Sequence, residues 1–124
     1  MCIARASMPQ LDLAEYDYFV QFCANQGIDV IRKPVVANAL NSMQCWGPWR
    51  SHIVKPTTAR KPVLVSSDYY ILDGNTRWAS ALLSKRSAID AVILDLRFYD
   101  AVKFMFTFPA TYAYGDGELH PYSV

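Results

Sequence analysis

The residues best suited to chemistry form one short run, Asp73, Gly74, Asn75, Thr76 and Arg77. The apolar stretch before this run is typical of a buried strand, and the spacing of apolar residues after it is typical of a helix. Gly74 permits a backbone conformation that other residues avoid, and Asn75 or Thr76 can cap the helix. The N–H groups of a first helical turn and the guanidinium of Arg77 suit a phosphate or a carboxylate. The run predicts an anion-binding site, and a plain structural turn into a capped helix is the alternative.

Asp73 is the one carboxylate beside this predicted site. A carboxylate there can hold Mg²⁺ or accept a proton from a hydroxyl group. Its alternative role is to hydrogen-bond the turn itself.

Patterns on either side predict the elements that position the run. Residues 62–65 and 69–72 form two short strands of a hairpin, and the helix that follows extends to about Lys85. The aliphatic stretch 88–96 predicts a buried strand, and residues 28–36 predict a strand that Pro34 confines to a sheet edge.

Helices are predicted near both ends of the chain. Asp12 has the form of an N-cap, and Gly27 follows the last apolar position of an N-terminal helix over about 12–26. The apolar stripe of this helix consists of Tyr16, Phe19, Val20 and Cys23. A second helix and an irregular tail occupy about 98–124.

Composition indicates one globular domain, residues 1–124, with its core over about 28–97. Of the 124 residues, 52% are hydrophobic, yet no apolar run is long enough for a membrane span. Because the first residues carry no extended apolar segment, we expect no membrane association and a cytoplasmic location. Three cysteines without a C-x-x-C spacing, and histidines only at His52 and His120, predict free thiols and no zinc site.

The charge is unevenly distributed although the formal net charge is +1. Between Asp29 and Asp68 there is no acidic residue. The cations of this stretch are Arg32, Lys33, Arg50, Lys55, Arg60 and Lys61. Such a stretch suits a DNA or RNA backbone or a polyphosphate if its members share a face, and Trp46 or Trp49 can stack on a base or pack in the core.

The central run, together with the Pro62-Val63-Leu64-Val65 strand before it, resembles the Gly-x-x-Arg signature of the ParB/sulfiredoxin superfamily. It is most similar to the branch with an Asp-Gly-His-His-Arg-Trp motif, which occurs in short phage-encoded ParB-like proteins. The resemblance is dense over residues 62–83 and weaker over 35–61. It implies an α+β fold, a single compact domain in which helices pack on a small mixed sheet.

The resemblance also implies a ligand. Members of the superfamily place this motif over the phosphates of a nucleotide, which assigns Gly74, Asn75, Thr76 and Arg77 to a nucleoside triphosphate and Asp73 to Mg²⁺. Gln44 stands where a ligand-binding glutamine of the pattern would lie, and a solvated loop residue is the alternative for this position. If the protein is an enzyme, Asp73 and Arg77 are its candidate catalytic residues for phosphotransfer or nucleotide hydrolysis. Asn75 occupies the position of the sulfiredoxin cysteine, so sulfiredoxin activity is not expected.

Two alternatives remain open at this point. The first is a nucleic-acid-binding protein or ParB-like nuclease that uses Arg50, Lys55, Arg60, Lys61, Trp46 and Trp49. The second is a non-catalytic module that binds a host or phage protein, which the replacement of both motif histidines by Asn75 and Thr76 favours. A homodimer is compatible with each of these hypotheses.

Overall fold

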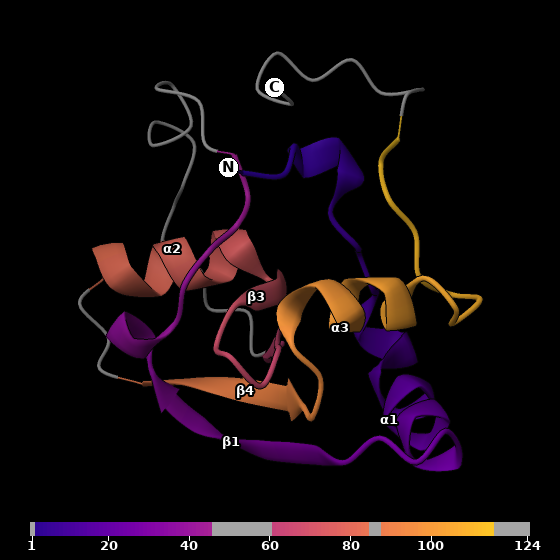
Figure 1. Ribbon diagram of the computed structural model, residues 1–124. Coiled ribbons are helices and arrows are strands. Elements are labelled where there is room, and N and C mark those ends of the chain that lie inside the picture. The colour runs from indigo at the N-terminus through magenta and orange to yellow at the C-terminus, as the bar shows by residue number, and fades with distance from the viewer. Residues whose placement is uncertain (1, 46–60, 85–87, 116–124) are drawn as a thin grey trace.

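A computed structural model describes residues 2–45, 61–84 and 88–115 as an α+β domain (Figure 1). Its centre is a four-stranded sheet with strand order β1-β4-β2-β3. The strands are β1 (Val30–Val36), β2 (Val63–Val65), β3 (Ile71–Asp73) and β4 (Ala88–Leu94). β2 runs parallel to β4, and the other two pairs are antiparallel, so the sheet is mixed as expected.

The sheet confirms the predicted hairpin and the predicted edge strand. β2 pairs with β3, with Leu64 opposite Asp73. Among the described strands, β1 pairs with β4 alone and is an outer strand of the sheet. Pro34 lies within β1, where its missing N–H is compatible with an outer position.

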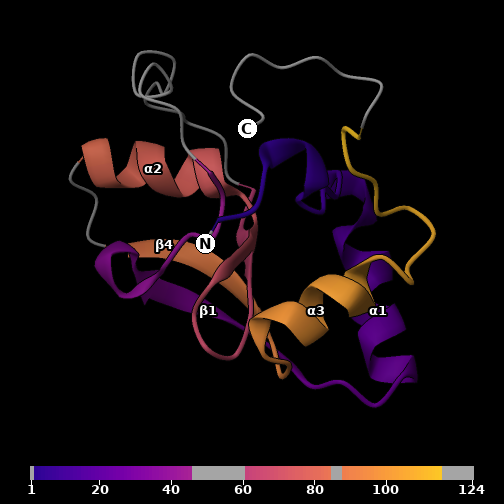
Figure 2. The same cartoon turned by 45° about the horizontal axis from the view of Figure 1, so that its top comes forward.

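Three helices cover the two faces of the sheet. They are α1 (Tyr16–Asn25), α2 (Asn75–Leu83) and α3 (Phe98–Met105). α2 lies over one face, and α1 and α3 lie together on the other side, as Figure 2 shows from a second angle. The N-terminal helix is shorter than predicted because residues Leu13–Glu15 form a separate 3-10 turn.

Alternation along the strands divides the core into two clusters. Leu64, Leu72, Val92 and Leu94 point toward the helices α1 and α3, where Phe19 and Met105 are fully buried. Their neighbours Val63, Val65, Ile71, Ala91 and Ile93 point to the opposite face, where Trp78 of α2 packs against them. Neighbouring residues of a strand face opposite ways, so the short strand β2 is buried on both sides.

The two predicted helix caps have different outcomes. Asp12 is the N-cap residue of the 3-10 turn Leu13–Glu15, but its side chain makes no cap hydrogen bond; its Oδ1 instead accepts a hydrogen bond of 3.1 Å from the hydroxyl of Tyr112. Asn75 is the first residue of α2 rather than its cap, and the N-cap is Gly74. In both cases a distant segment competes for the side chain that local sequence assigns to the helix.

The prediction of free thiols is also wrong for two of the three cysteines. Cys2 and Cys45 form a disulfide, with 5.0 Å between their Cα atoms, a separation typical of such bonds. Cys23 is a free thiol, buried in α1. Burial raises the pKa of the Cys23 thiol to about 11.

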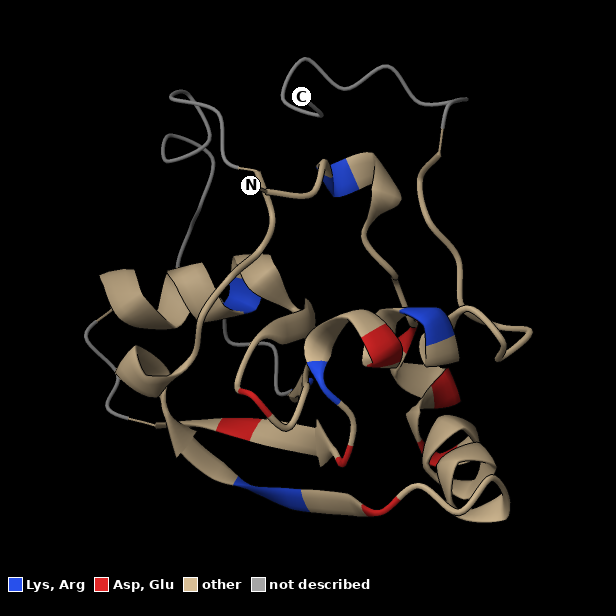
Figure 3. Ribbon diagram, viewed as in Figure 1, with Lys and Arg blue, Asp and Glu red and all other residues tan. Residues whose placement is uncertain are grey.

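Within the described ranges, lysines and arginines occur on several separate elements and at the N-terminal turn (Figure 3). Arg32 and Lys33, the described first members of the basic stretch, lie exposed on β1. Lys61, its last member, lies instead beside β2 and is half-buried. In the part of the chain that the structure describes, no helix is both long and apolar enough to cross a membrane.

Candidate anion-binding site

A polar cleft of about 340 Å³ opens at the beginning of α2. Its walls come from the run Asp73 to Arg77, from the segment before Cys45, from the N-terminal residues and from the segment after α3. The lining residues are Arg5, Gln10, Gln44, Lys61, Asp73, Gly74, Asn75, Thr76, Arg77, Tyr112 and Tyr114. Three of these side chains are cations and one is a carboxylate, so the lining carries a formal charge of +2.

Gly74 is required at the turn between β3 and α2 for two independent reasons. Its φ of +108° lies in the region that favours glycine. A Cβ at this position would lie 2.7 Å from Cγ1 of Val63 and 2.7 Å from Nη2 of Arg77. The glycine therefore lets the turn pack directly under the Arg77 side chain.

The N-terminus of α2 faces the cleft without a side-chain cap. The first N–H groups of a helix have no partner within the helix and carry partial positive charge. The side chain of Asn75 is 5% exposed and accepts a 2.5 Å hydrogen bond from Ser42 at its Oδ1. Asn75 and Thr76 both line the cleft, and the Oδ1 atom of Asn75 is directed to Ser42.

Arg77 is held against the protein by one end of its guanidinium. Its Nη2 donates to the carbonyl oxygen of Pro62 at 3.2 Å and to the Tyr16 hydroxyl at 3.3 Å. Its Nε is buried and has no hydrogen-bond partner among the described residues. The Arg77 side chain therefore fixes the turn to Pro62 and Tyr16, and it also carries one buried donor without a partner among the described residues.

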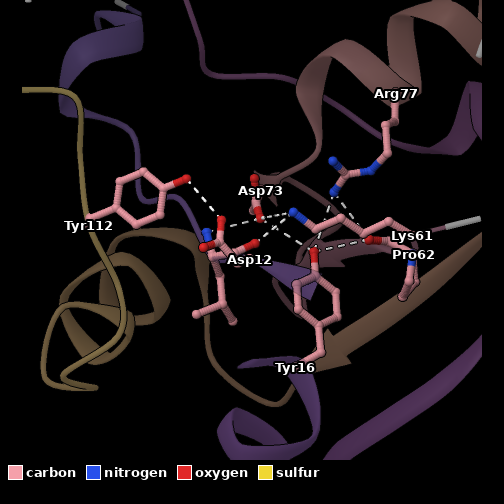
Figure 4. A network of polar contacts seen from close by, with 8 residues as sticks. Asp12, Tyr16, Lys61, Pro62, Asp73, Arg77 and Tyr112 are labelled. Atoms are coloured by element: carbon pink, nitrogen blue, oxygen red, sulfur yellow. Dashed lines mark hydrogen bonds and ion pairs between the residues drawn. The ribbon is translucent and has the colours of Figure 1, made fainter. Parts of the chain in front are cut away.

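Asp73 lies at the centre of a buried polar network (Figure 4). Its Oδ2 accepts hydrogen bonds from the Leu11 N–H at 3.2 Å and from the Tyr16 hydroxyl at 3.3 Å. The Nζ of Lys61 lies 3.6 Å from the same oxygen and donates to the Leu11 carbonyl at 2.6 Å. Burial and the adjacent Asp73 carboxylate raise the pKa of Tyr16, so its hydroxyl stays protonated. The network joins the start of α1 to the end of β3.

The structure brings Gln44 to the start of α2, although Gln44 precedes Gly74 by 30 positions in the sequence. The Ser42 hydroxyl accepts a hydrogen bond from the Gln44 N–H at 3.2 Å while it donates to Asn75. The Gln44 side chain is 6% exposed, and its Nε2 has no hydrogen-bond partner among the described residues. A buried amide without a partner carries a desolvation penalty of about 1–3 kcal/mol, which an acceptor on a ligand would remove.

Four lining residues were not among the predicted site residues: Arg5, Gln10, Tyr112 and Tyr114. The guanidinium of Arg5 stacks 4.2 Å above the ring of Tyr114. Gln10 and Tyr112 form an isolated antiparallel bridge, which fixes both segments at the cleft. Tyr112 is 42% exposed, yet partial desolvation and the hydrogen bond to Asp12 raise its pKa to about 12. No local motif marks these residues, so only the tertiary structure reveals them.

The predicted nucleic-acid contacts lie outside the described ranges, with the exception of Lys61. Trp46, Trp49, Arg50, Lys55 and Arg60 all fall in the stretch 46–60, which the structure does not describe. Lys61 lines the cleft, but its hydrogen bond to Leu11 and its ion pair with Asp73 direct it inward. A nucleic-acid surface made of these residues stays a prediction.

The described residues do not fit a metal ion held by the protein. No group of three potential ligands from His, Cys, Asp and Glu occurs among them. Asp73, the predicted ligand, already has two hydrogen-bond donors and a lysine at one of its oxygens. The cleft offers donors and cations, which suit an anion better than Mg²⁺.

The chain was also compared with known proteins. No family model matches it, and neither curated proteins nor solved structures give a significant match. Its resemblance to the ParB/sulfiredoxin superfamily therefore stays a prediction that rests on the quoted motif.

Proposed function

We propose that this domain binds a phosphate-bearing ligand, a nucleoside triphosphate, with its phosphates at the N-terminus of α2. One observation carries the proposal: Gln44, whose buried Nε2 has no partner among the described residues, is a lining residue of a cleft where a helix begins without a side-chain cap. Such a donor needs an acceptor, and phosphate oxygens are strong acceptors. The Nε of Arg77 is a second donor of the same kind.

Charge and size are compatible with this ligand. The lining has a formal charge of +2, and helix N-termini attract anions. The volume of about 340 Å³ lies at the lower end of the range for small-molecule sites. We infer that the cleft holds the phosphates and that the nucleoside extends toward its opening. The motif resemblance implies the same ligand class for Gly74 to Arg77.

The geometry supports binding more directly than catalysis. Proton abstraction by Asp73 requires an accessible carboxylate oxygen. Its Oδ2 is held by Leu11, Tyr16 and Lys61, and the residue as a whole is 4% exposed. Phosphotransfer or hydrolysis through Asp73 and Arg77 thus stays a prediction, and so does Mg²⁺ carried in by the phosphates. No observation on the described residues favours the nucleic-acid or protein-binding alternatives.

Gln44→Leu is the sharpest test of this proposal. The change removes the unused donor but keeps most of the side-chain volume, so the free protein should be as stable as the wild type or more stable. The affinity for ATP, CTP, GTP or inorganic triphosphate, whichever binds, should fall about tenfold to a hundredfold in calorimetric titration. Arg77→Ala is a less clear variant because it also removes the clamp to Pro62 and Tyr16.

Gln21→Leu provides the matched control, because Gln21 lies exposed on α1. This variant loses only the exposed hydrogen bond from Gln21 to Asn25, so it should leave the affinity unchanged and change stability by less than about 0.5 kcal/mol. If the folded wild type binds none of the four probes, or if Gln44→Leu binds as tightly as the wild type, the proposal is wrong. DNA binding with a steep salt dependence would then favour the nucleic-acid alternative.

A further inference from the structure

The first residues of the chain form one wall of the cleft. Residues 2–10, here named the N-terminal strap, carry Arg5 and Gln10 to the site. The strap lies between two other segments, 41–45 and 110–115. On one side, Ile3 pairs with the first of these segments: its N–H donates to Met43 at 2.6 Å, and its carbonyl accepts from Cys45 at 2.7 Å.

The other side of the strap pairs with the segment after α3. The Gln10 N–H donates to the Tyr112 carbonyl at 2.7 Å, and the reciprocal hydrogen bond measures 3.0 Å. The Gly115 N–H donates to the Ala6 carbonyl at 2.9 Å. The strap is therefore anchored near residue 10 by a reciprocal pair, whereas its beginning depends on the contacts of residues 2 and 3.

The Cys2–Cys45 disulfide joins that beginning covalently to the residue that follows Gln44. Apart from this bond, the same junction is held by two backbone hydrogen bonds at Ile3 and by the packing of Ile3 and Met43 against the core. Each of these two hydrogen bonds adds little net stability, because its donor and acceptor would otherwise bond to water. The disulfide thus fixes two walls of the cleft, the one with Gln44 and the one with Arg5.

We propose that Cys2 and Cys45 are positioning residues for the anion site, and that opening their disulfide with a dithiol lowers the affinity of the cleft for phosphates. The inference rests on the proposed function of the cleft. Cys2 is exposed and Cys45 is half-buried, so a reductant can reach the bond. A disulfide that a reductant can reach is a suitable redox sensor in a reducing compartment, the location expected from the sequence.

The chemistry is thiol–disulfide exchange. A thiolate of the dithiol attacks one sulfur of the pair and forms a mixed disulfide, and the displaced cysteine sulfur takes up a proton. The second thiol of the reductant then attacks its own mixed-disulfide sulfur and releases the other cysteine as a thiol. Two electrons and two protons pass to the protein, and the dithiol becomes a cyclic disulfide. Cys23 takes no part because it is buried.

The test is a calorimetric titration of inorganic triphosphate into oxidised wild type, into wild type reduced with dithiothreitol, and into the Cys2→Ser/Cys45→Ser double variant. We expect the Kd of the reduced protein to rise at least tenfold. The double variant should match the reduced protein and should not respond to dithiothreitol, which excludes an effect through Cys23. Circular dichroism before each titration establishes that the protein is folded.

Three results decide between the possibilities. No binding to the oxidised wild type would overturn the proposed function together with this inference. Binding with the same Kd in both redox states would overturn only the inference. A lower melting temperature with an unchanged Kd would show a merely structural disulfide and would overturn it too. If the double variant unfolds at room temperature, trimethylamine N-oxide favours its compact state, and the same comparison is made there.

Discussion

Replacing Gly74 by alanine should damage the fold and the site together. The new Cβ would lie 2.7 Å from Cγ1 of Val63, which is fully buried in β2 and has no room to move. Overpacking of this kind costs about 1–3 kcal/mol, and a non-glycine residue at positive φ costs about 1–2 kcal/mol more. We expect a total loss of about 3 kcal/mol in urea unfolding, or about 10 °C in melting temperature.

Gly27→Ala separates the two contributions. Gly27 also has a positive φ, +76°, but a Cβ there would meet nothing within 4 Å. Its replacement should cost only the backbone strain of about 1 kcal/mol. The difference of about 2 kcal/mol between the variants measures the contact with Val63 and Arg77. Equal losses in both variants would refute the argument that this close approach fixes glycine at the turn.

Three further predictions concern buried polar groups. Tyr16→Phe should lose about 1–2 kcal/mol in urea unfolding, with the exposed Tyr18→Phe as an unaffected control. The pKa of Tyr16 is raised above 10.0 in the folded state. The stabilisation that its protonated hydroxyl provides is therefore complete below about pH 10 and declines above it. The wild type should lose stability there faster than Tyr16→Phe, and equal pH profiles would contradict this. Because burial raises the pKa of Cys23 to about 11, iodoacetamide should alkylate it at about pH 8 only when urea unfolds the protein, and rapid native alkylation would contradict its burial. Lys61→Met leaves a buried carboxylate without its cation and should cost about 2 kcal/mol or more, whereas the exposed Lys103→Met should change stability by less than about 0.5 kcal/mol.

Elements with a strong local pattern could be predicted from the sequence. The hairpin before Gly74, the aliphatic strand β4 and the edge position of Pro34 all follow from apolar spacing and turn residues. The positive φ of Gly74 is expected for the same reason, because the strand must turn abruptly into a helix. Interactions between residues close in sequence determine these features, so the local sequence is enough to predict them.

Features that depend on distant pairing could not be predicted in the same way. Asp12 has the right type and spacing for a helix cap, yet Tyr112 competes for its carboxylate from the other end of the chain. Cys2 and Cys45 become partners only because Ile3 pairs with the segment around Met43. The position of Arg5 in the cleft wall could not be predicted either, because tertiary contacts rather than a sequence motif determine it.

The pairing of Gln10 with Tyr112 has a kinetic consequence for the protein. The neighbouring hydrogen bond from Tyr112 to Asp12 spans 100 positions of the chain, and such distant contacts are slow to form because closing a long loop is entropically unfavourable. The sheet and the start of α2 can form before this closure, but the cleft cannot. We therefore expect ligand binding to be the last signal that recovers in a refolding experiment, after the secondary structure has returned.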